Sequence, residues 1–284
     1  MFTLKIQNAN GEVFELTHNS KNYNVVSVQG LTRPPTAVNT SEGGNIDGSF
    51  WNSSRVEQRN IVIDVVIRGD IAANRQRLYK IFSLKKPCTI FFKCKNRDVK
   101  IIGYVEILDG DLFVLGEQIQ ISIICPRPYF EALDAIYTEL SQIVRMFEFP
   151  FSIAETEPIP FSEIEEYPLC TITNSGDVET GCIITVEFSG FVEGLTIYNT
   201  TNQTFFGLNY SFSAGDTLTI STVQGQKFIK LLRDGITSNL LNYMTAGSTW
   251  FTVGVGDNDF TFTTTTGADA VRVTFATADL FGGV

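Results

Sequence analysis

Histidine is nearly absent from this chain of 284 residues, and the groups that carry most enzyme chemistry are correspondingly sparse. The single histidine, His18, would have to serve any Ser-His-Asp or Cys-His mechanism, and no G-x-S-x-G motif accompanies it. No P-loop and no strand-linked G-x-G-x-x-G motif occurs. A glycosidase needs only two placed carboxylates, so turnover of a cell-wall polymer stays open as a minor alternative. The sequence predicts no enzyme and no catalytic residue.

Cysteine is also scarce. The five cysteines are an odd number, and none belongs to a C-x-x-C pair, so we interpret them as free thiols in a reducing compartment. Metal sites need clustered His and Cys or a spaced carboxylate loop, and Asp257-Asn258-Asp259 is too short for a calcium loop. We expect no metal and no cofactor.

Long apolar runs are missing too. No stretch approaches the ~20 apolar residues of a membrane span. The first 16 residues lack the basic-then-apolar pattern of a signal peptide. The net charge of −10 is uneven: residues 1–130 carry a net +4, residues 131–168 a net −8 and residues 169–284 a net −6. This acidity argues against nucleic acid as the main partner. We expect neither a membrane partner nor sequence-specific nucleic acid binding.

What the chain does have is strand patterning, and its clearest landmark lies at residues 119–130. Ile119, Ile121 and Ile123 alternate with polar residues, as in a strand with one buried face. Cys125-Pro126-Arg127-Pro128 ends that strand, because proline donates no backbone hydrogen bond. We predict a first domain over residues 1–130, with Pro126, Pro128, Tyr129 and Phe130 as a candidate interdomain hinge.

The first domain is expected to be mainly β, sandwich-like or barrel-like, with one packed helix. Residues 70–84 form the predicted helix, with Asp70 as its N-cap. Gly30–Asn60 is predicted to be a long polar loop. In it Phe50 and Trp51 either pin the loop to the core or contact another chain. The predicted strands cover residues 2–16 as a hairpin, then 23–28, 60–68, 89–92, 99–106 and 112–124.

The rest of the chain is predicted to be a connector over residues 131–167 and a β-sandwich domain over residues 168–284. In the connector, residues 132–147 have the spacing of an amphipathic helix, although their β-branched content leaves a strand open. Residues 153–167 are an acidic, proline-containing linker. The strands predicted in the sandwich are 170–173, 181–188, 194–199, 203–208, 217–222, 227–232, 250–255, 259–265 and 270–276.

Several separated stretches together resemble the distal tail protein (Dit) family of long-tailed, siphovirus-type phages or prophages of Gram-positive bacteria. These stretches occur in the same order as in that family, over nearly the whole chain. They are Gly30-Leu31-Thr32-Arg33-Pro34-Pro35, Arg59-Asn60-Ile61, Arg77-Leu78-Tyr79-Lys80-Ile81-Phe82, Cys125-Pro126-Arg127-Pro128-Tyr129-Phe130, Phe147-Glu148-Phe149-Pro150, Ile172-Thr173-Asn174-Ser175-Gly176-Asp177, Ser248-Thr249-Trp250-Phe251 and Gly256-Asp257-Asn258.

The resemblance implies a structural protein of the virion that is made and assembled in the host cytoplasm. Such proteins form a ring, usually a hexamer, that joins the tail tube to the baseplate, tip or fibre and lets DNA pass. Tail tube protein, tip or fibre protein and tape measure protein are the implied partners. The implied second domain is galectin-like. On this hypothesis Phe50, Trp51 and Arg55 are candidate subunit-interface residues.

The rival function is a carbohydrate-binding module that contacts host cell-wall saccharide. In it Trp250, Tyr210 or Tyr243 of the second domain would present a ring to a sugar face. Aromatic residues of a β-sandwich belong more often to its core. Binding of glycans by the second domain would favour this rival.

Overall fold

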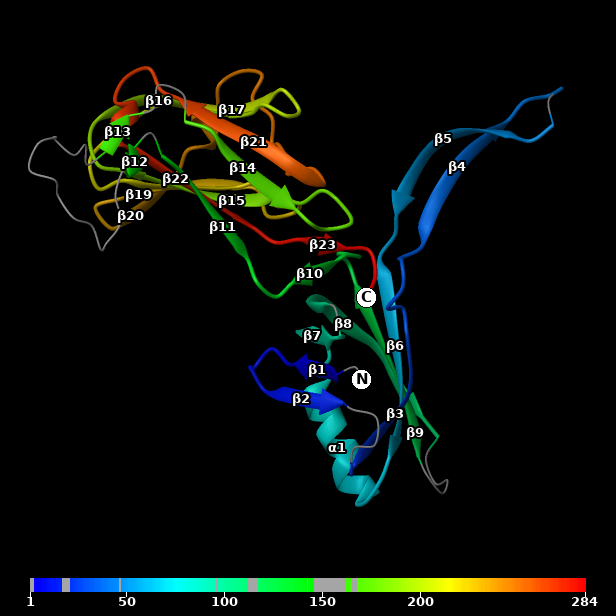
Figure 1. Ribbon diagram of the computed structural model, residues 1–284. Coiled ribbons are helices and arrows are strands. Elements are labelled where there is room, and N and C mark those ends of the chain that lie inside the picture. The colour runs from blue at the N-terminus through cyan, green and yellow to red at the C-terminus, as the bar shows by residue number, and fades with distance from the viewer. Residues whose placement is uncertain are drawn as a thin grey trace, which may run out of the picture. The chain divides into compact units, whose positions relative to one another are not determined.

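The computed structural model describes residues 3–16, 21–45, 47–95, 97–111, 117–141, 143–145, 162–164 and 168–284. The described chain is mostly β-structure and divides into two compact units (Figure 1). The first unit combines residues 1–133 with residues 280–284, and the second unit is made of residues 134–279. The second unit is therefore an insertion between two segments of the first.

The first unit is built on one antiparallel sheet. Its strands alternate buried apolar with exposed positions, as in β6, where every second residue is buried. The main path runs in the order β2 (Val13–Leu16), β1 (Thr3–Gln7), β7 (Pro87–Lys93), β8 (Asp98–Gly110), β9 (Gln118–Cys125), β6 (Arg59–Ile67) and β3 (Tyr23–Gln29). Beside it, β10 (Phe130–Ala132) pairs with β8 and with β23 (Leu280–Phe281).

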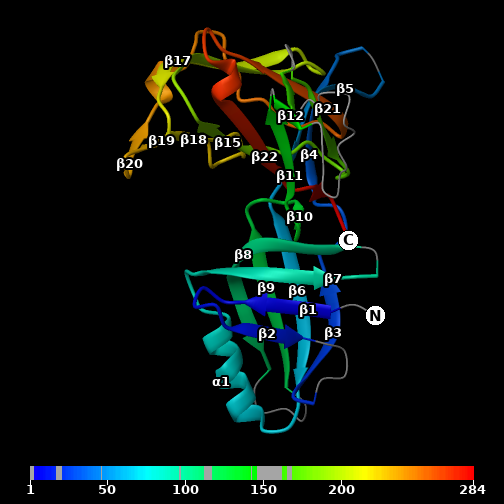
Figure 2. The same ribbon diagram turned by 60° about the vertical axis from the view of Figure 1, so that its left-hand side comes forward.

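This sheet curls toward a barrel. Strands β2 and β3 lie at opposite ends of the strand order, yet the rings of Phe14 in β2 and Tyr23 in β3 meet edge to face with centroids 4.9 Å apart. Helix α1 (Ile71–Ile81) lies alongside the sheet (Figure 2) and buries Leu78 and Ile81 in the same core. The prediction of a mainly β, barrel-like first domain with one packed helix is confirmed.

Helix α1 starts where the sequence predicted. The Asp70 side chain accepts a hydrogen bond from the backbone N–H of Ala73 at 3.1 Å, which satisfies one of the free donors of the first turn. The helix ends at Ile81, with Phe82 as its C-cap, so it is shorter than the predicted range of 70–84. The predicted hairpin near the N-terminus and the strands near residues 23–28, 60–68, 89–92 and 99–106 are present.

The predicted long loop over Gly30–Asn60 is wrong. Most of it is a second, two-stranded sheet of β4 (Thr36–Glu42) and β5 (Ser49–Val56), paired antiparallel with a bulge after Asn39. The sequence gives no strand pattern here because neither face of the ribbon is buried by the described part of the chain. Apolar alternation, which reports a buried face, is therefore missing from them.

The second unit is a β-sandwich. One sheet has six strands in the order β11 (Ile136–Ser141), β22 (Val271–Thr277), β15 (Cys182–Phe188), β18 (Thr217–Ser221), β19 (Phe228–Arg233) and β20 (Ile236–Asn239). The other sheet has four strands in the order β14 (Cys170–Asn174), β21 (Gly256–Thr263), β16 (Val192–Asn199) and β17 (Thr204–Phe212). Phe260 and Phe275, one from each sheet, meet in the core with ring centroids 4.9 Å apart.

Smaller elements complete the second unit. Short 3₁₀ helices lie at η1 (Leu241–Tyr243) and η2 (Ala268–Ala270). Strands β12 (Ile143–Arg145) and β13 (Ser162–Ile164) pair with each other. The remainder of the predicted acidic linker, residues 153–161 and 165–167, lies outside the described residues.

The choice between helix and strand that the sequence left open for residues 132–147 is decided for residues 136–141. They are a strand, because β11 pairs with β22 from Ile136 to Ser141 and supplies a sixth strand to the sheet. The strand predicted over residues 250–255 is wrong. Phe251 and Val253 are buried against the core, but the backbone makes one isolated bridge, between Val253 and Thr180. Apolar residues alternate there because Phe251 and Val253 pack into the core, and this alternation predicted a strand although the backbone forms no ladder.

Candidate assembly surface

The ribbon of β4 and β5, which we call the exposed hairpin, continues beyond the ends of β3 and β6 (Figure 1). Nearly all its side chains face solvent, and three of them are large and apolar. Trp51 is 66% exposed, Val38 58% and Phe50 54%. Phe50 and Trp51 are consecutive in a strand, so they point to opposite faces of the ribbon. Both faces of the hairpin therefore offer apolar contact area.

Polar side chains bridge the two strands of the exposed hairpin. The side-chain amide of Asn39 donates to the Ser53 hydroxyl at 3.0 Å, and the Ser41 hydroxyl donates to the side-chain Oδ1 of Asn52 at 3.3 Å. Within the described chain, β4 and β5 pair with each other and with no further strand, so both ribbon edges keep free backbone groups. An isolated two-stranded hairpin is only marginally stable in water. These features are typical of a segment that gains contacts by binding another chain.

The predicted interface residues all lie on β5. Phe50 and Trp51 stand near the tip of the hairpin, opposite Ser41 and Thr40, and Arg55 stands near its base, opposite Ala37. All three are exposed. Their role as an interface remains a prediction. Because all three lie on β5, the predicted contact would run along the length of that strand.

The predicted hinge residues lie in the first unit, before the chain leaves it after Leu133. Pro126 is exposed, Pro128 and Tyr129 are half-buried, and Phe130 is fully buried in β10. The Pro128 carbonyl accepts a hydrogen bond from Arg59 Nε at 2.7 Å, and the guanidinium of Arg59 lies 4.4 Å from the centroid of the Phe130 ring. The stretch is thus anchored at the start of β6, next to the base of the exposed hairpin.

Arg59 is the functional candidate that sequence reasoning missed. The family resemblance includes Arg59 but implies no role for it. Its side chain is 1% exposed and donates to four backbone carbonyls, those of Gly30, Thr32, Pro128 and Gly282. Burial lowers the pKa of Arg59, but a guanidinium starts from so high a pKa that it stays charged. Its signal in the sequence is an arginine at the first of the alternate positions of β6 that are otherwise filled by buried apolar residues.

The aromatic residues proposed to bind sugar are divided between core and surface. Trp250 is half-buried and packs on the core beside Phe206, with ring centroids 5.2 Å apart. Tyr243 is 46% exposed and meets Tyr210 edge to face at 4.8 Å. The guanidinium of Arg233 lies 5.7 Å from the Tyr210 ring.

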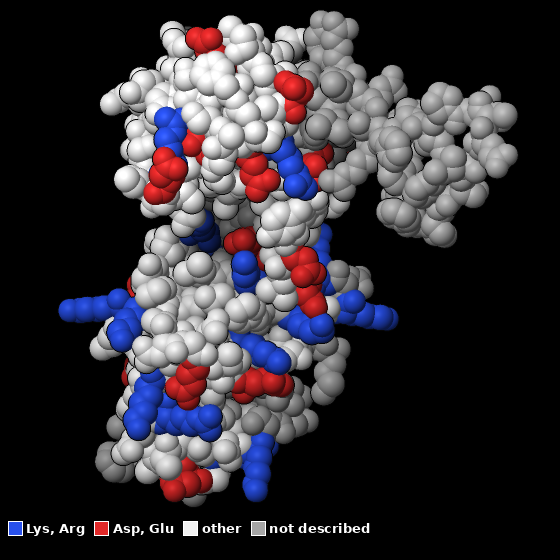
Figure 3. Space-filling view, turned by 90° about the vertical axis from the view of Figure 1, so that its left-hand side faces the viewer, with Lys and Arg blue, Asp and Glu red and all other residues white. Residues whose placement is uncertain are grey.

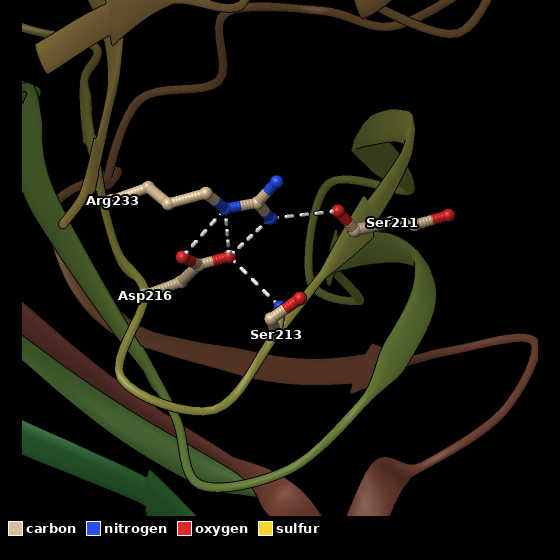
Figure 4. A network of polar contacts seen from close by, with 4 residues as sticks. All are labelled: Ser211, Ser213, Asp216 and Arg233. Atoms are coloured by element: carbon tan, nitrogen blue, oxygen red, sulfur yellow. Dashed lines mark hydrogen bonds and ion pairs between the residues drawn. The ribbon is translucent and has the colours of Figure 1, made fainter. Parts of the chain in front are cut away.

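Arg233 belongs to a polar network that ties β19 to the β17–β18 turn (Figure 4). Its Nε donates to both carboxylate oxygens of Asp216, at 2.9 and 3.1 Å, and its Nη2 donates to the Ser211 carbonyl. The backbone N–H of Ser213 donates to the same carboxylate at 2.8 Å. The hydrogen bond from Arg233 is the main reason that the pKa of Asp216 is lowered. Arg233 and Asp216 thus form an ion pair whose geometry is held by the backbone of Ser211 and Ser213.

Four of the five thiols are poorly suited to chemistry. All five cysteines are free, as predicted. Burial raises the pKa of Cys88 and Cys182 to about 11 and that of Cys125 and Cys170 to about 12, so these thiols stay protonated at neutral pH. The described residues bring together no group of three metal-ligating side chains. Their helices are too short or too polar to traverse a bilayer. His18 lies outside the described residues.

Charge on the first unit is mixed. On the face in Figure 3, Lys and Arg side chains lie among Asp and Glu side chains over that unit. Several form ion pairs, as Lys93 does with Asp98 at 2.6 Å and Lys100 with Glu131 at 3.3 Å. The surface charge of this unit is thus partly paired, and no single sign covers the face shown.

Comparisons with known proteins agree with this architecture. The profile described as "Siphovirus-type tail component, C-terminal domain" matches residues 175–278, and the profile described as "Phage tail protein RIFT-related domain" matches residues 10–113. A search of curated protein sequences finds no match.

Two solved structures show the same fold. The Dit protein of phage SPP1, described as a paradigm of hub adsorption apparatus in Gram-positive infecting phages, is 13% identical with a TM-score of 0.71, over 98% of this chain and 99% of that one. A chain of the phage P2 baseplate in its activated conformation is 12% identical with a TM-score of 0.53, over 97% and 98%. With one tail profile matching in each unit, the chain belongs to the distal tail (Dit) family of siphovirus-type tail components and is a structural, virion-associated protein of the phage tail.

Proposed function

We propose that six copies of the chain form a closed ring at the tip of the tail tube, and that the exposed hairpin makes the contact between copies. The observation that carries this proposal is the unpartnered hairpin of the first unit, with Phe50 and Trp51 in solvent. The ring joins the tube to the tip or receptor-binding apparatus, and its bore lets DNA pass. The chain acts as a structural subunit and not as an enzyme.

A closed ring needs a heterologous interface, in which one patch of each copy meets a different patch of the next. The hairpin suits such an interface because it leaves the curled sheet of its own unit as a separate ribbon. Exposed aromatic residues are the usual energetic anchors of protein contacts. The occupant of this surface is therefore the first unit of a second copy, and the second unit is left free for tip or fibre proteins.

The other partners follow from this position in the tail. The ring stacks on tail tube protein, carries the tip or fibre protein, and meets the tape measure protein before it leaves. Assembly takes place in the cytoplasm of the host. Pro126, Pro128, Tyr129 and Phe130, the candidate interdomain hinge, form the segment through which the chain leaves the first unit.

The first test is the native mass of the purified chain, with negative-stain images of the same sample. Wild type should form a ring of about six subunits, as for a closed heterologous interface. A chain carrying Phe50→Ser and Trp51→Ser should be mainly monomeric with unchanged thermal unfolding. Ile236→Ser is the matched control, since Ile236 is 72% exposed but lies on the second unit. A wild-type chain that binds the tail tube only as a monomer would contradict the proposed ring. Rings formed equally well by the double variant would exclude the hairpin.

The second candidate function is recognition of cell-wall saccharide by the second unit. The exposed Tyr243 ring, which packs edge to face on Tyr210, favours it, because a tyrosine offers both an apolar ring face and a hydroxyl that can hydrogen-bond to a sugar. Glycan-array binding by the full chain, abolished by Tyr243→Ala and kept by Ile236→Ser, would support this function. An array without signal would leave ring formation as the one proposed function.

A further inference from the structure

Three separate parts of the first unit meet at Arg59, and each of them bears on the exposed hairpin. The connection from β3 into the hairpin offers the carbonyls of Gly30 and Thr32 to Nη1 of the guanidinium. Arg59 itself opens β6, directly after the return from the hairpin. One side chain therefore ties the two legs of the hairpin together at its base.

The third part comes from the end of the described chain. Nη2 of Arg59 donates to the Gly282 carbonyl at 2.6 Å, and the N–H of Val284 donates to the Leu31 carbonyl at 3.1 Å. Arg97 holds the same segment, with a hydrogen bond to the Gly283 carbonyl at 2.8 Å and its guanidinium 4.3 Å from the Phe281 ring. Residues 281–284, which we call the returning segment, thus contact a hairpin leg directly as well as through Arg59.

All four acceptors of Arg59 are backbone carbonyls. A buried cation is costly unless its donors are satisfied, so removal of any of these acceptors weakens the whole arrangement. The returning segment supplies one of them, and it follows the second unit in the chain. The base of the hairpin is complete only when the chain has passed through the second unit and come back.

We infer that Arg59 is a positioning residue that fixes the direction of the exposed hairpin, and that docking of the returning segment switches this fixing on. The inference rests on the proposed function for its consequence. Chains whose returning segment has not docked carry a loosely directed hairpin and join the ring poorly. Folding of the second unit is thereby coupled to formation of the ring contact, because the returning segment follows the second unit in the chain. A completely folded subunit is therefore the one that assembles.

The test measures hairpin direction within one chain. Spin labels at Thr40→Cys on the hairpin and Gln76→Cys on α1, both exposed positions, are introduced with Cys94→Ser to remove the exposed native thiol. Their distance distribution should be narrow in the otherwise unaltered chain. It should broaden in Arg59→Met, which removes every donor, and in Val284→Pro, which removes the bond to Leu31 and keeps Arg59. Arg59→Lys, with fewer donors, should broaden it less.

The control is Lys93→Met, which removes an exposed cation of the same unit whose partner is Asp98. It should leave the distribution narrow. Ring formation by the same variants at a temperature well below unfolding should fall about tenfold or more with Arg59→Met, the size expected for the loss of hydrogen bonds to a charged group. It should fall about two- to tenfold with Val284→Pro, which removes one neutral hydrogen bond.

The outcomes separate this inference from the proposed ring. A narrow distribution in every folded variant, with lowered thermal stability alone, would make Arg59 merely stabilising and overturn the inference. If Arg59→Met does not fold, Val284→Pro decides by the same measurement. A wild-type chain that never forms rings would overturn the proposed function, and the distance measurement would still decide the positioning by Arg59.

Discussion

Asp216 makes part of the stability of the second unit depend on pH. Its side chain is 2% exposed and is held by Arg233 and by the backbone N–H of Ser213 (Figure 4). These contacts lower the pKa of Asp216 in the folded chain. A lowered folded pKa gives a stabilisation that is fully present above the unfolded pKa of about 3.9 and is lost as pH falls through the folded pKa.

Asp216→Asn should therefore lower the free energy of unfolding at pH 7 by about 1.5–3 kcal/mol, the range for hydrogen bonds to charged groups. The difference in the free energy of unfolding between wild type and variant should narrow as pH falls below about 4. Urea unfolding from pH 7 down to pH 2 measures both effects. Ser213→Ala is the control, because the backbone of Ser213 is the donor and survives the substitution. A gap that stays constant with pH would show that Asp216 contributes no titrating interaction.

Gly30 is required by both its conformation and its surroundings. Its φ is +81°, and a Cβ there would lie 2.0 Å from the backbone oxygen of Asn60. Gly30→Ala should destabilise the first unit by about 3 kcal/mol or more, since backbone strain adds to a clash that no side-chain rotation relieves. Gly11→Ala, with a φ of +84° and open space around it, should cost about 1 kcal/mol. Equal losses in urea unfolding would mean that the close approach to Asn60 relaxes freely.

Sequence patterns identified the residues whose role is local and missed those whose role is to join distant segments. Asp70 was predicted as an N-cap because its partner lies three residues away, at Ala73. Arg59 binds carbonyls 27, 29, 69 and 223 residues away, and no spacing rule reports such contacts. Phe50 and Trp51 were singled out because large aromatic residues are unusual in a polar stretch, which needs no knowledge of the fold.

Helix α1 depends on its first turn. Asp70→Ala removes the acceptor for the N–H of Ala73 and should lower the stability of the first unit by about 1 kcal/mol. Asp70→Ser keeps an oxygen acceptor at the cap and should recover most of that loss. Thermal unfolding of both variants beside wild type measures the difference. If alanine and serine are equivalent at this position, packing of Leu78 and Ile81 holds the helix and the cap adds little.

Strands with one buried face were predicted well, and segments outside that rule were not. Strand β6 alternates completely and was predicted within one residue of its ends. In the exposed hairpin both faces meet solvent, so polarity was mistaken for a loop. For strand β11 the sequence leaves helix and strand open, because its apolar spacing fits a helix and its β-branched residues suit a strand, and pairing with β22 decides between them. Long-range pairing is the information that a local pattern lacks.

The order of segments in the first unit shows that the second unit is inserted into a hairpin. Strands β10 and β23 pair antiparallel, Phe130 with Phe281 and Glu131 with Leu280, although 148 residues lie between Glu131 and Leu280. The chain leaves and re-enters the first unit at neighbouring points of one ladder. Residues 280–284 were predicted to belong to the second domain, as composition gave no hint of their return.

A short turn should therefore be able to replace the second unit. In the proposed variant, Ala132 is joined to Asp279 through Asn-Gly, which keeps the register of the β10–β23 ladder and forms a two-residue hairpin turn. We expect this shortened chain to fold cooperatively, because the buried cluster of the first unit lies wholly within its own two segments. Circular dichroism and urea unfolding measure folding, and native mass measures assembly.

The matched control is a chain that ends at Ala132 and so lacks β23 together with the Gly282 and Val284 contacts. It should be less stable than the shortened chain, since it leaves one donor of buried Arg59 without its acceptor. Rings formed by the shortened chain would assign the contact between copies to the first unit. A shortened chain that folds but stays monomeric would move that contact to the second unit, and one that does not fold would show that the first unit needs its insertion.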